Sequence, residues 1–150
     1  MVKDDELPAI FRHNTPQNVE NQAQEAAASV IAGLAEQYPA WTIKEIERLK
    51  KLFGEICSEK NARQAELIHG DFYRIIHDIK GQGATFGYPL MTQIGTYLCA
   101  LIKGKEVFTK ADLCQFDEGI RIMQTILEQK MVGEDSDGML LVERLTKDKK

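Results

Sequence analysis

The chain has 150 residues, 43% of them hydrophobic and 28% charged, which is typical of a single globular domain. Its 23 acidic residues outnumber its 19 basic ones, and the net charge of −4 argues against a protein that binds DNA, RNA or anionic lipid. The acidic first residues are not followed by an apolar run, and no stretch approaches the roughly 18 apolar residues of a membrane span. We therefore expect no secretion signal, no membrane contact and no nucleic-acid partner.

The first predicted helix begins at the pair Thr15-Pro16, an N-cap followed by proline at the first helical position. Its apolar residues recur at intervals of three and four up to about Tyr38. The sequence Pro-Ala-Trp at 39–41 is expected to end this helix, because a proline inside a helix removes a backbone hydrogen bond.

Four amphipathic helices are then predicted over about 42–60, 62–84, 88–103 and 109–131, with threonine N-caps at 42 and 109. Their inward-facing residues are expected to include Ile43, Ile46, Leu49, Phe53 and Ile56; Ala65, Phe72, Ile75, Ile76 and Ile79; Leu90, Ile94, Leu98 and Leu101; and Phe116, Ile120, Met123 and Ile126. Short connections between such helices indicate an antiparallel four-helix bundle.

The predicted fold is therefore all-α, an antiparallel four-helix bundle with an additional N-terminal helix and a short C-terminal helix over about 139–145. Residues 1–41 are assigned to an N-terminal tail and accessory helix, and residues 42–131 to the bundle. Residues 132–150 are assigned to a polar linker, the short helix and a frayed tail.

Three cysteines, Cys57, Cys99 and Cys114, lie far apart and form no C-x-x-C pair. An odd number at this spacing predicts neither a disulfide framework nor a thiolate zinc site, and it indicates a reducing cytoplasm. Cys99 and Cys114 fall within apolar helical segments and are expected in the core.

His77 is predicted on the solvent face of the helix over 62–84. With residues placed at intervals of about 100° and Phe72 at 0°, the apolar side chains gather near 0° and His77 falls at about 140°. The same stripe carries Gly70, Arg74, Lys80, Gly81 and Ala84. Glycine costs about 1 kcal/mol inside a helix, so two glycines beside an exposed histidine indicate clearance for an approaching macromolecule.

Charge supports this interpretation. Residues 71–110 hold five basic and three acidic residues, a net positive charge in a chain that is negative as a whole. Lys80, one turn after His77, could reach a phosphoryl group on the imidazole. The alternative is a surface histidine that lies beside an incidental glycine.

The run 77–87, HDIKGQGATFG, resembles the H-x-x-K-G motif of histidine phosphotransfer (HPt) domains, with a further glycine ten residues after the histidine. The Thr-Phe-Gly at its end is similar to the branch found at the N-terminus of chemotaxis histidine kinases. The resemblance covers about 41–131 and implies that His77 is the phosphoacceptor, Lys80 the phosphate-stabilising cation and Gly81 the clearance residue.

Such a protein would relay a phosphoryl group between a histidine kinase or receiver domain and an aspartate of a response regulator. It would have no autonomous kinase activity, since no phosphate-binding glycine-rich loop follows a strand. It would need no cofactor, because the partner's receiver domain would hold the Mg²⁺. Gln93 could hydrogen-bond a ring nitrogen or a phosphoryl oxygen, while Arg74 and Ala84 are expected on the docking surface.

One other interpretation of the function remains open. The protein could be a helical docking or regulatory protein for a kinase or response regulator, with His77 vestigial. His69 and His77 could suggest a metal site, but no E-x-x-H pair accompanies them and none is predicted. Tyr73 could flank the docking surface or cover the core, and His13 is assigned no role.

Overall fold

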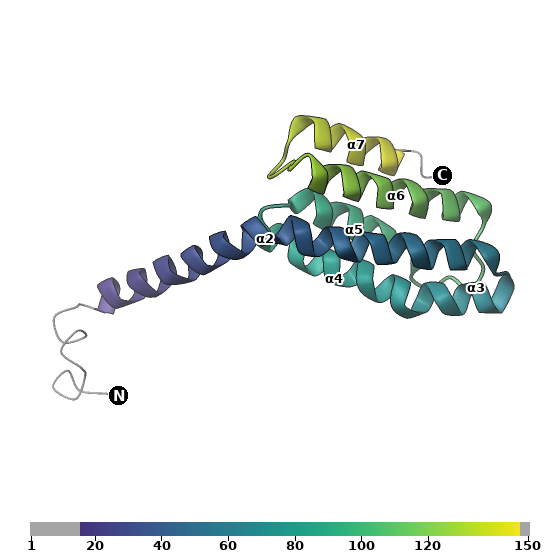
Figure 1. The fold of residues 1–150 in the computed structure, drawn as a ribbon, viewed down its shortest axis with the longest axis horizontal. Helices are drawn as coiled ribbons and strands as arrows, with labels where there is room; N and C mark the ends of the chain where they lie inside the picture. Colours follow the sequence, from purple (N-terminus) through teal and green to yellow (C-terminus); the bar gives the residue numbers. More distant parts are fainter. Residues whose placement is uncertain (1–15, 148–150) are drawn as a thin grey trace, which may run out of the picture. The chain divides into compact units, whose positions relative to one another are not determined.

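The structure is a computed structural model that describes residues 16–147, and every regular element in that range is helical. The elements are α2 (Pro16–Ser58), α3 (Asn61–Leu67), a π segment (Ile68–Phe72), α4 (Tyr73–Gly83), a 3-10 segment (Ala84–Phe86), α5 (Pro89–Ile102), α6 (Lys110–Glu128) and α7 (Ser136–Lys147) (Figure 1). The all-α prediction is confirmed for this range. His13, Thr15 and the last three residues, Asp148, Lys149 and Lys150, lie outside the described residues.

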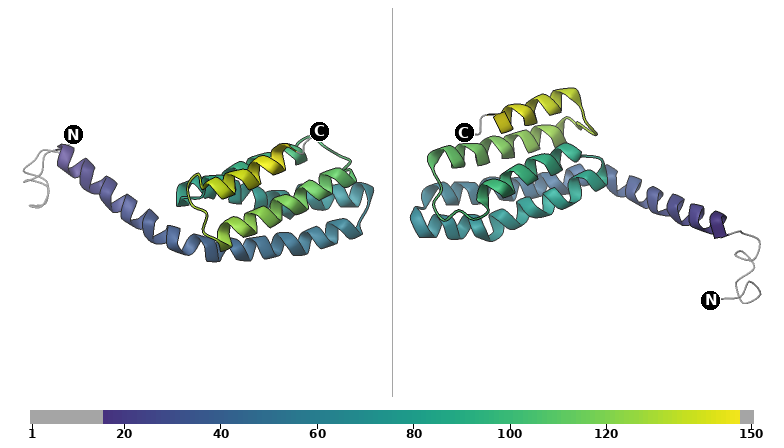
Figure 2. Two further views of the ribbon diagram at one scale, coloured as in Figure 1. Left: turned by 90° about the horizontal axis from the view of Figure 1, so that it is seen from above. Right: turned by 180° about the vertical axis from the view of Figure 1, so that it is seen from behind.

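The chain divides into two compact units, Met1–Glu36 and Gln37–Lys150. In the first unit the described residues belong to α2, where the side chains of Val30 and Ile31 are exposed. The second unit contains the remaining elements, and α7 packs against both α5 and α6 (Figure 2). Residues 132–147 are therefore part of the same unit as the predicted bundle helices.

The predicted break at Pro39 is wrong, because α2 continues through it to Ser58. Tyr38 and Thr42 are both buried and stand four residues apart, so only an uninterrupted helix turns both toward the core. Burial of these side chains offsets the cost of about 3 kcal/mol that an internal proline imposes. Thr42 accordingly lies inside α2 and does not cap a separate helix.

The core of the second unit is built around aromatic side chains. Tyr38 packs between Phe86 and Tyr88, with ring centroids 5.3 Å away on each side. Phe72 contacts Phe53 at 6.4 Å and Phe116 at 5.5 Å. The contacts of Tyr38 join α2 to the connection between α4 and α5, and those of Phe72 join the π segment to α2 and α6.

A π segment, unforeseen from the sequence, precedes α4. Gly70 lies within it at φ −91° and ψ −124°, outside helical values. The helical run is kinked there, so α3 does not continue the helical wheel drawn from Phe72. Gln64 is buried in place of Ala65, and its amide nitrogen donates hydrogen bonds to the carbonyl oxygens of Ile56 and Glu59, each at 3.0 Å.

The helix ends marked by Thr109, Pro89 and Gly87 lie where the sequence predicts them. Thr109 caps α6 in a capping box, in which its hydroxyl accepts from the Asp112 N–H at 3.1 Å and the Asp112 carboxylate accepts from the Thr109 N–H at 2.9 Å. Pro89 occupies the first turn of α5. Gly87, at φ +90°, ends the preceding helical run in the left-handed conformation that glycine favours. No helix among the described residues is long and apolar enough to cross a membrane.

Candidate functional site

His77 lies on the exposed face of α4, as predicted. The neighbouring Ile75, Ile76 and Ile79 are buried, and together they fix which side of the helix faces water. The ring of Tyr73, one turn earlier, lies with its centroid 5.9 Å from that of the imidazole. The histidine is thus held on a rigid helix, supported on one side by an aromatic ring and open to solvent.

Gly81 leaves open space one turn after His77. It is exposed, and a Cβ placed on it would meet nothing within 4 Å. The surface beyond the imidazole is therefore unobstructed, which is what the clearance role requires. A Cβ added to Gly70, which lies at the kink before α4, would likewise meet nothing within 4 Å.

Lys80 is half-buried, because its stem lies against α5. A Cβ added to Gly95 would come within 2.7 Å of the Lys80 Cβ and 3.0 Å of its Cα. Burial raises the pKa of the Cys99 thiol on the same face of α5, and the Lys80 ammonium and the Tyr73 hydroxyl oppose part of that rise. Lys80, Tyr73 and Cys99 therefore meet where α4 packs on α5.

The hydroxyl of Thr92 joins these two helices. It donates a hydrogen bond to the carbonyl oxygen of Lys80 and accepts one from the N–H of Ala84, both at 2.9 Å. In a regular α-helix the Ala84 N–H would bond to the Lys80 carbonyl itself. The hydroxyl is therefore inserted into the backbone of the helix that carries His77.

Gln93 is not brought to this side. The residues of α5 that meet α4 include Thr92, Gly95 and Cys99, spaced by three and four. Gln93 is turned about 100° from Thr92 and lines a small cleft with Met139, Val142, Glu143 and Thr146 of α7. No hydrogen bond joins it to His77 among the described residues, so the expected contact with the ring is not present.

Arg74 is exposed on α4, but its charge is paired. Its guanidinium lies 2.9 Å from the carboxylate of Asp71, one turn earlier. Lys105 is likewise bound to Asp112 at 2.8 Å. The excess positive charge predicted for residues 71–110 is thus partly neutralised by ion pairs, one of them within the segment itself.

A shallow depression of about 430 Å³ lies beside His77, lined by His69, Gly70, Asp71, Tyr73, Arg74 and His77. The ring of His69 does not complete a metal site with His77, because its Nε2 is hydrogen-bonded to the carbonyl oxygen of Lys105 and its ring packs on Phe108. In the described part of the chain, no group of three or more histidine, cysteine, aspartate or glutamate side chains is placed to bind a metal ion.

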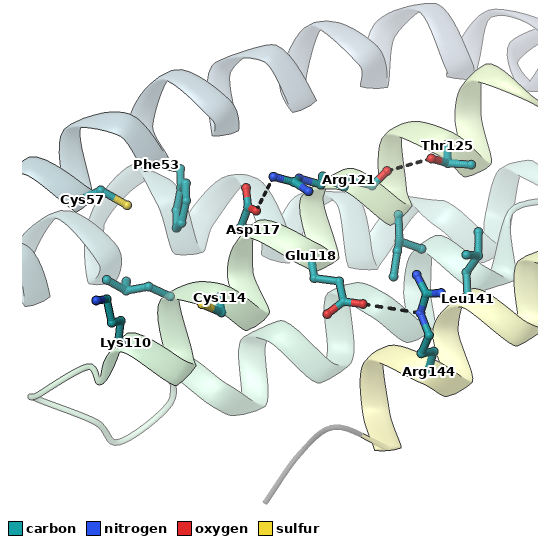
Figure 3. A pocket seen from close by; sticks show the side chains of 12 residues that line it. Phe53, Cys57, Lys110, Cys114, Asp117, Glu118, Arg121, Thr125, Leu141 and Arg144 are labelled. Atoms are coloured by element: carbon teal, nitrogen blue, oxygen red, sulfur yellow. Dashed lines mark hydrogen bonds and ion pairs between the residues drawn. The ribbon is translucent and has the colours of Figure 1, made fainter.

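A larger groove of about 740 Å³ runs between α2, α6 and α7 (Figure 3). Its lining residues are Phe53, Cys57, Lys110, Leu113, Cys114, Asp117, Glu118, Arg121, Ile122, Thr125, Leu141 and Arg144. The expectation that Cys114 is buried is wrong, since it is exposed in this groove, whereas Cys99 is buried as predicted. Partial burial raises the pKa of the Cys57 thiol, and the nearby Asp117 carboxylate raises it further.

Comparison of the chain with protein-family models, with curated proteins and with solved structures finds no match. The functional argument therefore depends on the geometry of α4 and α5. Sequence reasoning missed two residues there, Thr92 and Gly95. Their signal is a row of small side chains at helical spacing on α5, completed by Cys99, which indicates the face on which two helices approach closely.

Proposed function

We propose that the protein is a histidine-containing phosphotransfer protein that relays a phosphoryl group between a histidine kinase or receiver domain and an aspartate of a response regulator. One observation carries the proposal. His77 is exposed on a helix, with open space above Gly81 and with the stem of Lys80 packed against Gly95 one turn away. A nucleophile, a cation and an unobstructed approach are the three features that such a transfer needs.

The HPt proposal also implies an antiparallel four-helix bundle, formed by α2 from Gln37 onward, α3 with α4, α5 and α6. The short connections between these elements and their shared core support this arrangement. In it, α7 would be an addition that packs on α5 and α6. The reducing cytoplasm is the compartment in which such relays and three free cysteines would both be expected.

In the proposed reaction, a ring nitrogen of neutral His77 attacks the phosphorus of an aspartyl phosphate on the partner. The N–P bond forms as the P–O bond to the aspartate breaks, and the carboxylate leaves with the bonding electron pair. The Lys80 ammonium offsets the negative charge of the phosphoryl oxygens. Mg²⁺ held by the receiver's acidic pocket would assist on the partner's side, and attack by a second partner's aspartate would reverse the step.

The test is to incubate the full chain with a panel of phosphorylated receiver domains and active sensor kinases and to follow label on the protein. We expect label that is labile in acid and stable in alkali, the stability pattern of a phosphohistidine. His77→Gln should lose it while retaining the helical circular dichroism and the thermal midpoint, because the side chain is exposed. Loss of label in His69→Gln instead would show that the site is misassigned.

The second candidate is a helical docking or regulatory protein that carries no phosphoryl group. The groove between α2, α6 and α7 favours it, because apolar side chains such as Phe53 and Leu141 lie there among the charges of Asp117, Arg121 and Arg144 (Figure 3). This candidate predicts partner binding that survives His77→Gln and requires no label.

A further inference from the structure

We propose that Thr92 is a positioning residue that holds Lys80 in place for the phosphoryl group on His77. The inference rests on the proposed relay function and extends it to a residue on the neighbouring helix. Thr92 does not reach the reacting atoms. It acts on the backbone from which the Lys80 side chain extends.

The geometry is a hydroxyl bridge within one turn of α4. The Thr92 Oγ1 atom donates to the Lys80 carbonyl oxygen at 2.9 Å and accepts from the Ala84 N–H at 2.9 Å. A hydroxyl can do both at once, since it has one hydrogen to donate and lone pairs to accept with. The bridge fixes the position of the Lys80 backbone along α4 relative to the start of α5.

Two glycines create the space for this bridge. A Cβ added to Gly83 would lie 2.7 Å from the Thr92 Oγ1, and one added to Gly95 would lie 2.7 Å from the Lys80 Cβ. Both helices therefore contribute a glycine at the point where they are joined. Such close approach leaves Lys80 little freedom at its first side-chain bonds, because one side of the stem is occupied by α5.

The consequence concerns the direction of the ammonium group. A lysine that is free on a helix surface samples many rotamers and spends only part of its time near a residue three positions earlier. Lys80 starts from a fixed backbone and a stem held against Gly95, so fewer of its rotamers remain available. Restricting the cation in advance lowers the cost of placing it on the phosphoryl oxygens.

The experiment uses a small phosphoryl donor, so that docking of a protein partner does not enter. Phosphoramidate transfers its phosphoryl group to a ring nitrogen of His77 and releases ammonia. The labelling rate is measured across donor concentrations for the wild-type chain and for Thr92→Val, which keeps the branched shape and removes the hydroxyl. We expect the maximal rate to fall about tenfold, with a much smaller change in half-saturating donor concentration.

Two variants serve as controls. Thr92→Ser retains the hydroxyl and should restore most of the maximal rate. Thr96→Val removes a hydroxyl one turn later on α5 that donates only to the carbonyl oxygen of Thr92 in its own helix, so it should leave the rate near that of the wild type. If Thr92→Val fails to fold, Thr92→Ala removes the hydroxyl without adding atoms and should lower the maximal rate, whereas Thr92→Ser should label near the wild-type rate; equal rates in these two variants overturn the proposal.

A double-mutant cycle separates positioning from a merely structural role. In a Lys80→Ala background, Thr92→Val should lower the labelling rate no further, although it should lower the thermal midpoint as it does in the wild type. An equal loss of rate in both backgrounds, or a wild-type rate in Thr92→Val, overturns the inference and leaves the relay function standing. Failure of the wild-type chain to label at His77 with any of the phosphorylated receiver domains and kinases contradicts the proposed function, and the role of Thr92 falls with it.

Discussion

Gly95 of α5 faces Lys80 of α4 so closely that a methyl group on the glycine would lie 2.7 Å from the Lys80 Cβ. Real Cβ atoms do not approach at this distance, so the backbone of one helix must move if the glycine is replaced. The contact therefore sets the separation of α4 and α5 at the level of the proposed phosphoacceptor.

Gly95→Ala is expected to destabilise the protein by about 1–3 kcal/mol through overpacking, and to lower the rate of phosphotransfer as Lys80 is displaced. Gly54→Ala is the matched control, because Gly54 lies in α2 and a Cβ there would meet nothing within 4 Å. That variant should be up to about 1 kcal/mol more stable than the wild type. Chemical denaturation measures the stability of both variants, and the transfer assay measures their rates. Wild-type stability and rate in Gly95→Ala would show that α4 and α5 can separate at no cost.

Gly81→Gln should change stability and function in opposite directions. The residue is exposed and nothing lies within 4 Å of its Cβ position, so glutamine should stabilise the helix by up to about 1 kcal/mol. The same side chain would project beside His77 and obstruct a protein partner. Gly54→Gln should give a comparable gain in stability with transfer intact, and normal transfer in Gly81→Gln would refute the clearance role.

Lys80→Ala and Arg74→Ala should affect different steps. Loss of the Lys80 ammonium is expected to lower the transfer rate at saturating partner, since the cation acts on the phosphoryl group. Loss of Arg74 should raise the partner concentration required and flatten the salt dependence. Because Arg74 is paired with Asp71, Asp71→Asn should have the reverse effect on docking to an acidic receiver surface. Single-turnover transfer at two ionic strengths distinguishes these outcomes; an effect of Lys80→Ala on affinity alone would make it a docking residue.

Asp112 should make stability depend on pH in the acid range. Burial by itself would raise the pKa of this carboxyl, but hydrogen bonds from Lys105 and Thr109 and the charge of Lys105 outweigh it, so the pKa lies below the ordinary value. The unfolded chain then binds the proton more readily. The stabilisation is complete above the unfolded pKa of about 4 and is lost as the pH falls through the lower folded pKa.

Asp112→Asn is therefore expected to lower the free energy of unfolding at pH 7 by about 1 kcal/mol and to reduce its decline below pH 4. Urea denaturation at a series of pH values measures both effects. Asp117→Asn is the control, because its ion pair with Arg121 involves exposed side chains and should contribute little. If the free energy of unfolding fell with decreasing pH in the same way in both variants, Asp112 would not be the cause of the pH dependence.

The parts of the fold that could be predicted are the helix ends at which a single residue determines the conformation of the neighbouring backbone. Thr109 and Pro89 mark the starts of α6 and α5, and Gly87 marks the end of the helical run after α4. Pro39 carries an equally strong local signal, yet burial of Tyr38 and Thr42 on one face outweighs it. Such burial depends on the rest of the core and cannot be read from residues 39–41.

The candidate site also has one part that could be predicted from the sequence and one part that could not. The exposure of His77 follows from the apolar residues of α4 alone, so the helical wheel placed it correctly. The partners on α5 depend on which face of that helix meets α4. Gln93 was expected within reach of the ring or a phosphoryl oxygen, but the small side chains of Thr92 and Gly95 permit the close approach of the two helices, and they determine the contact face.

At Gly70 the backbone leaves helical values, so α3 and α4 are two helices that meet at a kink. The direction in which α3 leaves this kink places the Gln64 amide against the carbonyls of Ile56 and Glu59. Forcing residues 68–72 into a regular helix would change that direction and pull the amide away from both carbonyls. A substitution that straightens the chain here should therefore lower stability through α2 and α3, although it touches neither of them directly.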